Sequence, residues 1–461
     1  MQVPPASASF VPGATRHFPT ASRVSGLLTA QHMTHSAAGQ SDRGRQRAAL
    51  VGLATGVVTK AAAEHSLEEL DGLARAAGAD VVLRLVQERP APDPALYLGR
   101  GKVGMLKQAC AELDVDLVIV DNELSPAQLR NLEKETGQAV LDRTQLILDI
   151  FARRARTREG QLQVELAQLK YLMPRLVGSG DWLSRLGGGI GTRGPGETKL
   201  ETDRRHIRHR LSVIGKQIAD VKARRAQLRD RRREGLLPTV ALVGYTNAGK
   251  TTLFNRLARQ EALASDALFV TLDPLLRQVR LTDGPQILLS DTVGFIDRLP
   301  HSLVAAFRAT LEEVVQADLL LHVVDAADPD RERHIEAVER VLTEIEAHEV
   351  PRLRVYNKVD RISDDERARL DAGPDGAVSV SAAAGTGIQT LEREVSRRLA
   401  LDTERVRLEF DAGDESHQAR IARVYRHARV LSHQDEAGRI AIEADVPRRW
   451  LSRLAGDHAA R

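Results

Sequence analysis

The chain has 461 residues, of which 42% are hydrophobic and 28% are charged, and this composition is typical of a soluble globular protein of about three domains. Its single cysteine, Cys110, excludes a disulfide framework, and no stretch approaches the about 20 apolar residues of a membrane-spanning helix. The net charge of +3 is small, and an aromatic content of 3% argues against a surface on which single-stranded nucleic acid stacks.

Residues 1–44 differ in composition from the rest of the chain. Up to Ser41 they include neither Asp nor Glu and are rich in Ser, Ala, Pro and Thr. Such a composition is typical of a disordered tail and also of an organellar transit peptide. We expect a disordered extension on a cytoplasmic protein, and organellar targeting stays the alternative.

Residues 45–150 alternate between strand and helix patterns and predict a small α/β domain with a parallel sheet. The stretches "DVVLRLV" and "VDLVIVD" predict strands, and "RGKVGMLKQACAEL" and "SPAQLRNLEKETG" predict helices. The second helix has Ser125 as its N-cap, Pro126 in its first turn and Gly137 at its C-terminal end. We expect the glycines of "LGRGKVG" to form a simple turn rather than an anion site, because no hydroxyl or acidic residue follows at a spacing that would indicate a binding motif.

Residues 151–235 change to an apolar spacing of three and four residues, which predicts helices. Two helices joined by one loop should pack as an antiparallel hairpin, the second about 40 Å long. The glycine-rich stretch "GGGIGTRGPGETKLETDRR" then lies at the hairpin tip. The apolar seam consists of Leu162, Leu166, Leu169, Met173 and Leu176 in the first helix, and of Ile207, Leu211, Ile214, Ile218, Val221 and Leu228 in the second.

The glycine-rich stretch contains G-x-G-x-x-G, the spacing of a dinucleotide-binding turn, from Gly189 to Gly194. No apolar strand precedes it, and Glu201 and Asp203 follow far sooner than the roughly 20 residues expected for a ribose-binding acid. We therefore reject a dinucleotide-dependent oxidoreductase. The glycines suit a mobile tip on a rigid stalk instead.

The segment Arg204–Arg233 carries twelve Lys or Arg residues against two Asp residues. Such a concentration of positive charge is an electrostatic footprint for phosphate backbones, and a solvated helix face explains it equally well. His206 and His209 have the spacing of metal ligands, but the surrounding arginines would repel a cation. We predict that both histidines are solvated helix residues.

Residues 236–400 alternate between strands and helices as in a doubly wound α/β domain. Gly244–Thr251, "GYTNAGKT", matches G-x-x-x-x-G-K-[ST] between the apolar strand "TVALVG" and the helix "GKTTLFNRLA", and this context indicates a P-loop. In a P-loop the backbone N–H groups surround the β-phosphate, and Lys250 would neutralise β- and γ-phosphate oxygens. The Thr251 hydroxyl would ligate Mg²⁺.

Three further motifs follow in order. In "DTVGF", Asp291 can reach Mg²⁺ through water, and the Gly294 N–H can contact the γ-phosphate. Thr271 in "FVTLDP" is the best candidate for a second hydroxyl, besides that of Thr251, that contacts both Mg²⁺ and the γ-phosphate. In "NKVD", the Asp360 carboxylate would accept two hydrogen bonds from guanine, and adenine offers neither donor. "SAAAG" fits the loop whose Ala382 N–H reads guanine O6.

These motifs predict a GTPase rather than an ATPase, with Lys250, Thr271 and Gly294 as catalytic residues and Thr251 and Thr271 as Mg²⁺ ligands. The predicted nucleotide-binding residues are Gly244, Tyr245, Thr246, Asn247, Ala248, Gly249, Lys250, Thr251, Thr252, Phe269, Val270, Thr271, Asp291, Gly294, Asn357, Lys358, Asp360, Ser381, Ala382 and Ala383.

Phe295 stands where a glutamine orients the attacking water in Ras-like enzymes, and a phenyl ring cannot do this. The water must therefore be positioned by a partner, a mobile loop or a bound ion. Asn247 matches the position that helps to hold K⁺ in potassium-activated GTPases, but support of the loop by a local hydrogen bond is the favoured explanation.

Residues 401–461 predict a small α+β domain in the order β-α-β-α.

"GGIGTRGPGETKLETDRR", "GYTNAGKTTLFN", "DTVGF", "LPHSLVAAFRATLEE" and "NKVD" together closely resemble the HflX family of ribosome-associated GTPases, over residues 45–400. The first stretch is specific to that family. The resemblance implies a monomeric protein that binds the large ribosomal subunit and its rRNA and splits stalled or heat-stressed ribosomes. The resemblance also implies that the hairpin tip contacts RNA, with these candidate residues: Gly191, Thr192, Arg193, Gly194, Pro195, Gly196 and Lys199.

The alternative hypothesis is a ribosomal RNA-binding assembly factor in which GTP only controls binding. The two hypotheses differ in whether GTP causes ribosomal subunits to separate.

Overall fold

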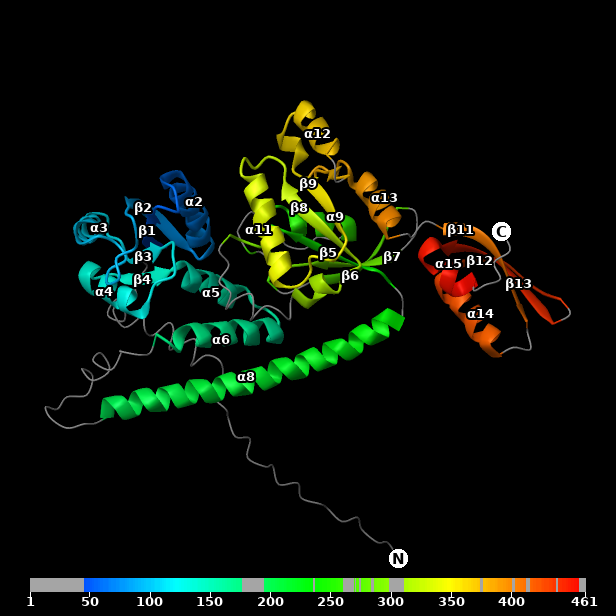
Figure 1. Cartoon of the computed structure of the whole chain (residues 1–461), viewed down its shortest axis with the longest axis horizontal. Coiled ribbons are helices and arrows are strands. Elements are labelled where there is room, and N and C mark those ends of the chain that lie inside the picture. The colour runs from blue at the N-terminus through cyan, green and yellow to red at the C-terminus, as the bar shows by residue number, and fades with distance from the viewer. Residues whose placement is uncertain are drawn as a thin grey trace, which may run out of the picture.

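The structure is a computed structural model that describes residues 45–175, 195–234, 237–259, 269, 271–272, 275–282, 286–297, 311–373, 376–399, 403–411, 415–436 and 438–455. Three sheets, of four, six and three strands, follow one another along the chain, and a long helix, α8, lies alongside the shorter helix α6 (Figure 1). No helix in these ranges is both long and apolar enough to cross a bilayer. The α/β fold class predicted from the sequence is confirmed.

The N-terminal domain is built on a parallel sheet with the strand order β2-β1-β3-β4. Helix α4 begins with the predicted capping residue: the Ser125 side chain accepts from the Gln128 N–H at 3.2 Å, and Gly137 ends the helix in the left-handed conformation with a φ of 74°. The elements are β1 (Gln46–Ala54), α2 (Lys60–Ala76), β2 (Ala79–Glu88), α3 (Arg100–Glu112), β3 (Leu117–Val120), α4 (Pro126–Thr136), β4 (Ala139–Asp142) and α5 (Arg143–Arg154).

The helical hairpin consists of α6 (Arg158–Leu172) and α8 (Pro195–Glu234), which run side by side (Figure 1). Seven of the predicted seam residues form one apolar cluster, and the Arg210 guanidinium pairs with both oxygens of Glu165 at 2.6 and 2.7 Å. The clustered residues are Leu162, Leu166, Leu169, Ile207, Leu211, Ile214 and Ile218.

The predicted length of the second helix was wrong. Helix α8 has 40 residues and so extends about 60 Å rather than about 40 Å. It already begins at Pro195, inside the stretch predicted as a tip loop, because proline suits the first turn of a helix and the first turn contains only one glycine, Gly196. Residues 187–194 of the predicted loop lie outside the described residues.

The central domain has six strands in the order β10-β9-β8-β5-β7-β6, all parallel except β6, which pairs antiparallel with β7. Figure 1 shows α11 and α9 on this sheet. The elements are β5 (Thr239–Gly244), α9 (Lys250–Ala258), β6 (Leu275–Arg280), β7 (Gln286–Asp291), β8 (Leu319–Asp325), α11 (Arg331–Glu344), β9 (Arg352–Asn357), η1 (Val359–Arg361), α12 (Asp364–Asp371), β10 (Val378–Ser379) and α13 (Ile388–Arg398).

The C-terminal domain corrects the predicted order β-α-β-α. A third strand, β12 (Arg429–Glu436), follows α14 (Glu415–His427). This segment forms a hairpin with β13 (Arg439–Pro447), turning at Gly438 with a φ of 83°, so strand pairing overrides the local helical pattern. The remaining elements are β11 (Thr403–Asp411), which also pairs with β13, and α15 (Arg448–Ala455).

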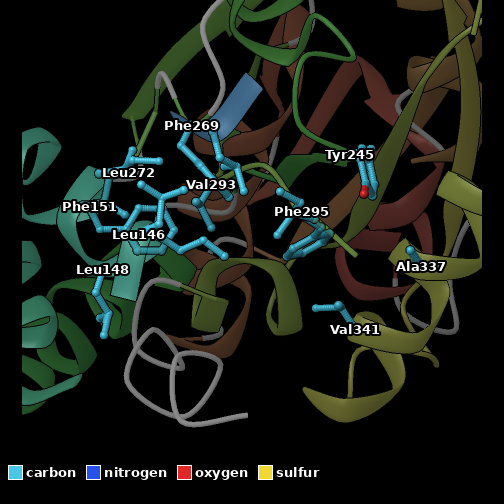
Figure 2. Packing of buried hydrophobic residues seen from close by; sticks show 14 of the residues in the cluster. Leu146, Leu148, Phe151, Tyr245, Phe269, Leu272, Val293, Phe295, Ala337 and Val341 are labelled. Carbon is cyan, nitrogen blue, oxygen red and sulfur yellow. The ribbon is translucent and has the colours of Figure 1, made fainter. Parts of the chain in front are cut away.

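One hydrophobic core joins the N-terminal domain to the central domain (Figure 2). The rings of Phe151, from α5, and Phe269 meet edge to face with their centroids 4.7 Å apart. Val293 and Phe295, from the "DTVGF" segment after β7, belong to the same cluster. The two domains therefore share buried apolar surface next to the P-loop.

Candidate nucleotide site

The P-loop connects β5 to α9 and depends on glycine at both of its ends. Gly244 has a φ of 153°, and a Cβ there would lie 2.2 Å from the Val323 carbonyl oxygen. Gly249, the residue before α9, has a φ of 88°, and its Cβ would lie 2.2 Å from the Asn357 amide nitrogen. Any larger residue would clash at either position, so the loop needs glycine at both ends to adopt this conformation.

Lys250 lies buried beneath the loop. Its ammonium group donates to the carbonyl oxygens of Gly244 and Tyr245 at 3.0 and 2.7 Å. Burial lowers the pKa of Lys250 to about 8, and the Asp291 carboxylate opposes this shift. The lysine is therefore held in place before any phosphate arrives.

Because the charged form of Lys250 binds phosphate, affinity for GDP is expected to fall as the pH rises through the lysine pKa. With a pKa of about 8 in the free protein, the affinity at about pH 8.5 should be about fourfold lower than at about pH 7. Titrations with a fluorescent GDP derivative would measure this. A Lys250→Arg variant should show a flat profile whatever its absolute affinity, and an equally steep profile in that variant would contradict the assignment.

Two hydroxyls and one carboxylate converge at the start of α9. The Oγ1 atoms of Thr251 and Thr271 are 2.7 Å apart, and they lie 2.8 and 3.0 Å from one carboxylate oxygen of Asp291. The other oxygen of Asp291 is buried and has no hydrogen-bond partner. Neighbouring ligands of an octahedral Mg²⁺ ion lie about 3 Å apart, so this oxygen cluster fits that ion.

Asn357 links the "NKVD" segment to two other loops. Its amide nitrogen donates to the Ala248 carbonyl at 2.9 Å, and its amide oxygen accepts from the Ala382 N–H at 3.0 Å. The Ala382 N–H expected at guanine O6 is thus occupied by Asn357 in this structure, and its contact with guanine stays a prediction.

Asp360 is exposed, and a hydrogen bond from Ser381 lowers the pKa of its carboxyl group. An adenine base would therefore leave this carboxylate unpaired and out of water only where the base itself covers Asp360. Lys358 forms an ion pair with Asp325 at 2.7 Å.

Arg256, in the last turn of α9, was not predicted. Its Nε donates to the Ala382 carbonyl at 3.0 Å, and its guanidinium also contacts the Ala383 carbonyl. Arg256 therefore anchors the "SAAAG" loop to the helix that follows the P-loop. No motif in the sequence marks this residue.

Several of the residues predicted to bind the nucleotide do not line the site with their side chains. The Phe269 ring packs against Phe151 of the N-terminal domain (Figure 2), and the Tyr245 hydroxyl contacts Glu69 of the same domain, so the backbones of both residues are left to face a nucleotide. Asn247 has a φ of 60°, a conformation that asparagine adopts more readily than most residues, which explains its presence without an ion. Val270 and Gly191–Gly194 lie outside the described residues.

Phe295 is 1% exposed, and its ring points into the core shared by the two domains (Figure 2). Its backbone pairs with the P-loop: the Phe295 N–H donates to the Gly244 carbonyl at 3.1 Å, and the Thr246 N–H donates to the Phe295 carbonyl at 2.7 Å. This residue contributes packing and backbone pairing, and no side-chain hydrogen bond to a water molecule.

A P-loop, a threonine–aspartate oxygen cluster and an "NKVD" segment, all at the carboxyl edge of one sheet, define the class of P-loop GTPases. Models of three protein families match the chain: "GTP-binding GTPase N-terminal" over 64–152, "GTP-binding GTPase Middle Region" over 154–232 and "50S ribosome-binding GTPase" over 239–358. The chain belongs to the HflX family of GTPases, and it binds and hydrolyses GTP.

Similar proteins include GTPase HflX of Caldanaerobacter subterraneus subsp. tengcongensis, 45% identical over 89% of this chain and 90% of the relative. GTPase HflX of Escherichia coli K12 is 49% identical over 73% of this chain and 79% of the relative. The crystal structure of a GTP-binding protein from Sulfolobus solfataricus with GDP is 24% identical, covers 77% of this chain and 98% of that chain, and has a TM-score of 0.41.

Proposed function

We propose that this GTPase associates with the large ribosomal subunit and uses GTP to dissociate stalled or stressed ribosomes. The family supports this, since the model that matches residues 239–358 is described as a ribosome-binding GTPase. The observation that carries the proposal is α8: Ile214 and Ile218 are buried against α6, while Arg205, Arg208 and Lys216 are exposed. A helix fixed by one face and basic on the other is suited to contact RNA phosphates.

In this proposal the P-loop N–H groups hold the phosphates, Lys250 neutralises their charge, and the Gly294 N–H contacts the γ-phosphate. Thr251 and Thr271 would hold Mg²⁺, with Asp291 reaching it through water, and the ion would supply positive charge for the phosphate oxygens. Asp360, held by Ser381, recognises guanine. Asn247 needs no ion to explain its conformation, so K⁺ is not part of the proposal.

Light scattering by purified ribosomes distinguishes the proposal from its alternative, an assembly factor whose RNA binding GTP controls. A fall in scattering that requires GTP supports dissociation. Stable binding without any fall in scattering supports the assembly factor. A deletion of residues 191–196 that leaves the ribosome-linked activity intact would contradict the role of the tip.

Reversing the charge of Arg205, Arg208 and Lys216 to glutamate is expected to weaken binding to the large subunit by at least tenfold at moderate salt. The salt dependence of the remaining binding should also be less steep, because fewer counterions are released. Co-sedimentation at several salt concentrations measures both effects. Lys107→Glu, an exposed change on α3, is the matched control and should leave binding as in the wild type.

A further inference from the structure

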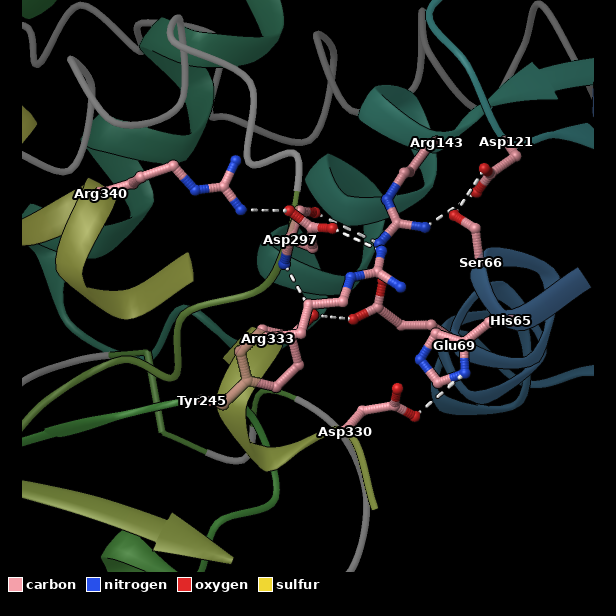
Figure 3. Close-up of polar contacts among 10 residues, drawn as sticks. All are labelled: His65, Ser66, Glu69, Asp121, Arg143, Tyr245, Asp297, Asp330, Arg333 and Arg340. Carbon is pink, nitrogen blue, oxygen red and sulfur yellow. Dashed lines mark hydrogen bonds and ion pairs between the residues drawn. The ribbon is translucent and has the colours of Figure 1, made fainter. Parts of the chain in front are cut away.

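A closed ring of hydrogen bonds joins the P-loop and the "DTVGF" segment to the N-terminal domain (Figure 3). The Tyr245 hydroxyl donates to the Glu69 carboxylate and accepts from the Asp297 N–H at 2.8 Å. Arg143 pairs with the same carboxylate and donates to the Asp297 carbonyl at 3.3 Å. Each of the four residues thus contacts two of the others, so the ring spans α2, α5, the P-loop and the segment after β7.

Both sides of the ring are anchored in their own domains. Arg143 is 3% exposed and forms a second ion pair with Asp121 at 2.9 Å. The Asp297 carboxylate pairs with Arg333 at 2.7 Å and with Arg340 at 3.1 Å, both from α11. The ring can therefore open only if the domains separate or if the backbone near Asp297 moves.

The backbone just before Asp297 occupies the space beside the P-loop lysine. A Cβ on Gly294 would lie 3.1 Å from the Lys250 Nζ and 3.0 Å from the Thr246 Cα. The pairing of Phe295 with Gly244 and Thr246 keeps Gly294 there. A γ-phosphate must contact the same lysine, so Gly294 and Phe295 must first move outward from the P-loop, to a position from which the Gly294 N–H can contact that phosphate.

We propose that Glu69 and Arg143 are positioning residues of the GTPase site, supplied by the N-terminal domain. By holding Tyr245 and Asp297, they keep Gly294 on the P-loop, and docking of the domain competes with the γ-phosphate. A diphosphate does not need this space. Since coupling between two binding events is reciprocal, weakening the ring must favour the triphosphate over the diphosphate.

The same linkage connects the nucleotide to the helical hairpin. Arg175, just after α6, donates to the Leu124 carbonyl at 2.9 Å and to the buried Asp142 carboxylate at 3.2 Å, which fixes the end of α6 to the N-terminal domain. A γ-phosphate that loosens the domain interface therefore changes the placement of α6 and of its partner α8. This inference rests on GTP binding and not on the proposed action on ribosomes.

Tyr245→Phe removes the hydroxyl and leaves the loop backbone and the stacking on His334, whose ring lies 3.8 Å away at 12°. We expect this variant to shift the ratio of the affinities for guanosine 5′-(β,γ-imido)triphosphate and GDP about tenfold toward the triphosphate analogue. Glu69→Gln should shift the ratio of the two affinities in the same direction. Titration of purified full-length protein with fluorescent nucleotides measures both affinities without ribosomes.

Two variants serve as matched controls. Tyr97→Phe removes a buried hydroxyl that contacts Asn122 at 2.6 Å within the N-terminal domain, and Glu68→Gln neutralises the exposed neighbour of Glu69. Both should leave the affinity ratio unchanged. The double variant Tyr245→Phe, Glu69→Gln should match either single variant, since each opens the same ring.

An unchanged ratio in folded Tyr245→Phe and Glu69→Gln proteins, with or without a lower melting temperature, would mean that the ring only stabilises the fold and would overturn the inference. A shift of the ratio toward GDP would overturn it too, because docking would then assist the γ-phosphate.

Discussion

Replacing Asp360 with asparagine is expected to lower kcat/KM for GTP by on the order of 10³- to 10⁴-fold and to shift the preference of the enzyme to xanthosine triphosphate. The carboxylate would accept hydrogen bonds from guanine N1–H and N2–H₂, whereas the amide of asparagine would point a donor at the N2 amine. Xanthine carries a carbonyl oxygen at that position, so it would pair with the amide.

Phosphate release with each nucleotide measures this change. Asp365→Asn, an exposed substitution in the first turn of α12, is the matched control and should leave the GTP preference intact. If Asp360→Asn retained full selectivity for GTP, the base would have to bind elsewhere than beside the "NKVD" segment.

The nucleotide motifs could be predicted from the sequence because each depends on a few neighbouring residues. The P-loop needs glycine at Gly244 and Gly249 because of the close approach of Val323 and Asn357, and this requirement appears directly as a fixed spacing. The convergence of Thr251, Thr271 and Asp291 could also be anticipated, since they follow strands and loops at one edge of a sheet.

Other features depend on contacts between distant parts of the chain. The Arg143 side chain meets a backbone carbonyl 154 positions away, and the Tyr245 hydroxyl meets a carboxylate 176 positions away, so no local pattern reveals the ring. Strand β12 was missed for the same reason, because its pairing with β13 decides its conformation. The start of α8 was misjudged because glycines near Pro195 suggested a loop.

Replacing Arg143 with alanine is expected to lower the free energy of unfolding by about 3–5 kcal/mol. The guanidinium is 3% exposed and neutralises Asp121, which is also 3% exposed, together with Glu69, whose side chain is 15% exposed. Without it, two largely buried carboxylates keep their charge and lose this ionic partner, while the hydrogen bonds from Ser66 to Asp121 and from Tyr245 to Glu69 remain. Urea unfolding monitored in the N-terminal and central domains measures the loss.

Arg75→Ala is the matched control. Arg75 also forms an ion pair, with Asp71 at 3.1 Å, but the Arg75 side chain is 65% exposed. The loss there should not exceed about 1 kcal/mol. Neutralising the partners as well, in Arg143→Met, Asp121→Asn, Glu69→Gln, should recover part of the stability lost in Arg143→Ala, since no buried charge is then left unpaired. Recovery of stability without recovery of the wild-type preference between GDP and the triphosphate analogue would separate the two roles of Arg143. Because Glu69→Gln alone is expected to shift this preference, the triple variant would then differ from the wild type through the open ring and not through a loss of stability.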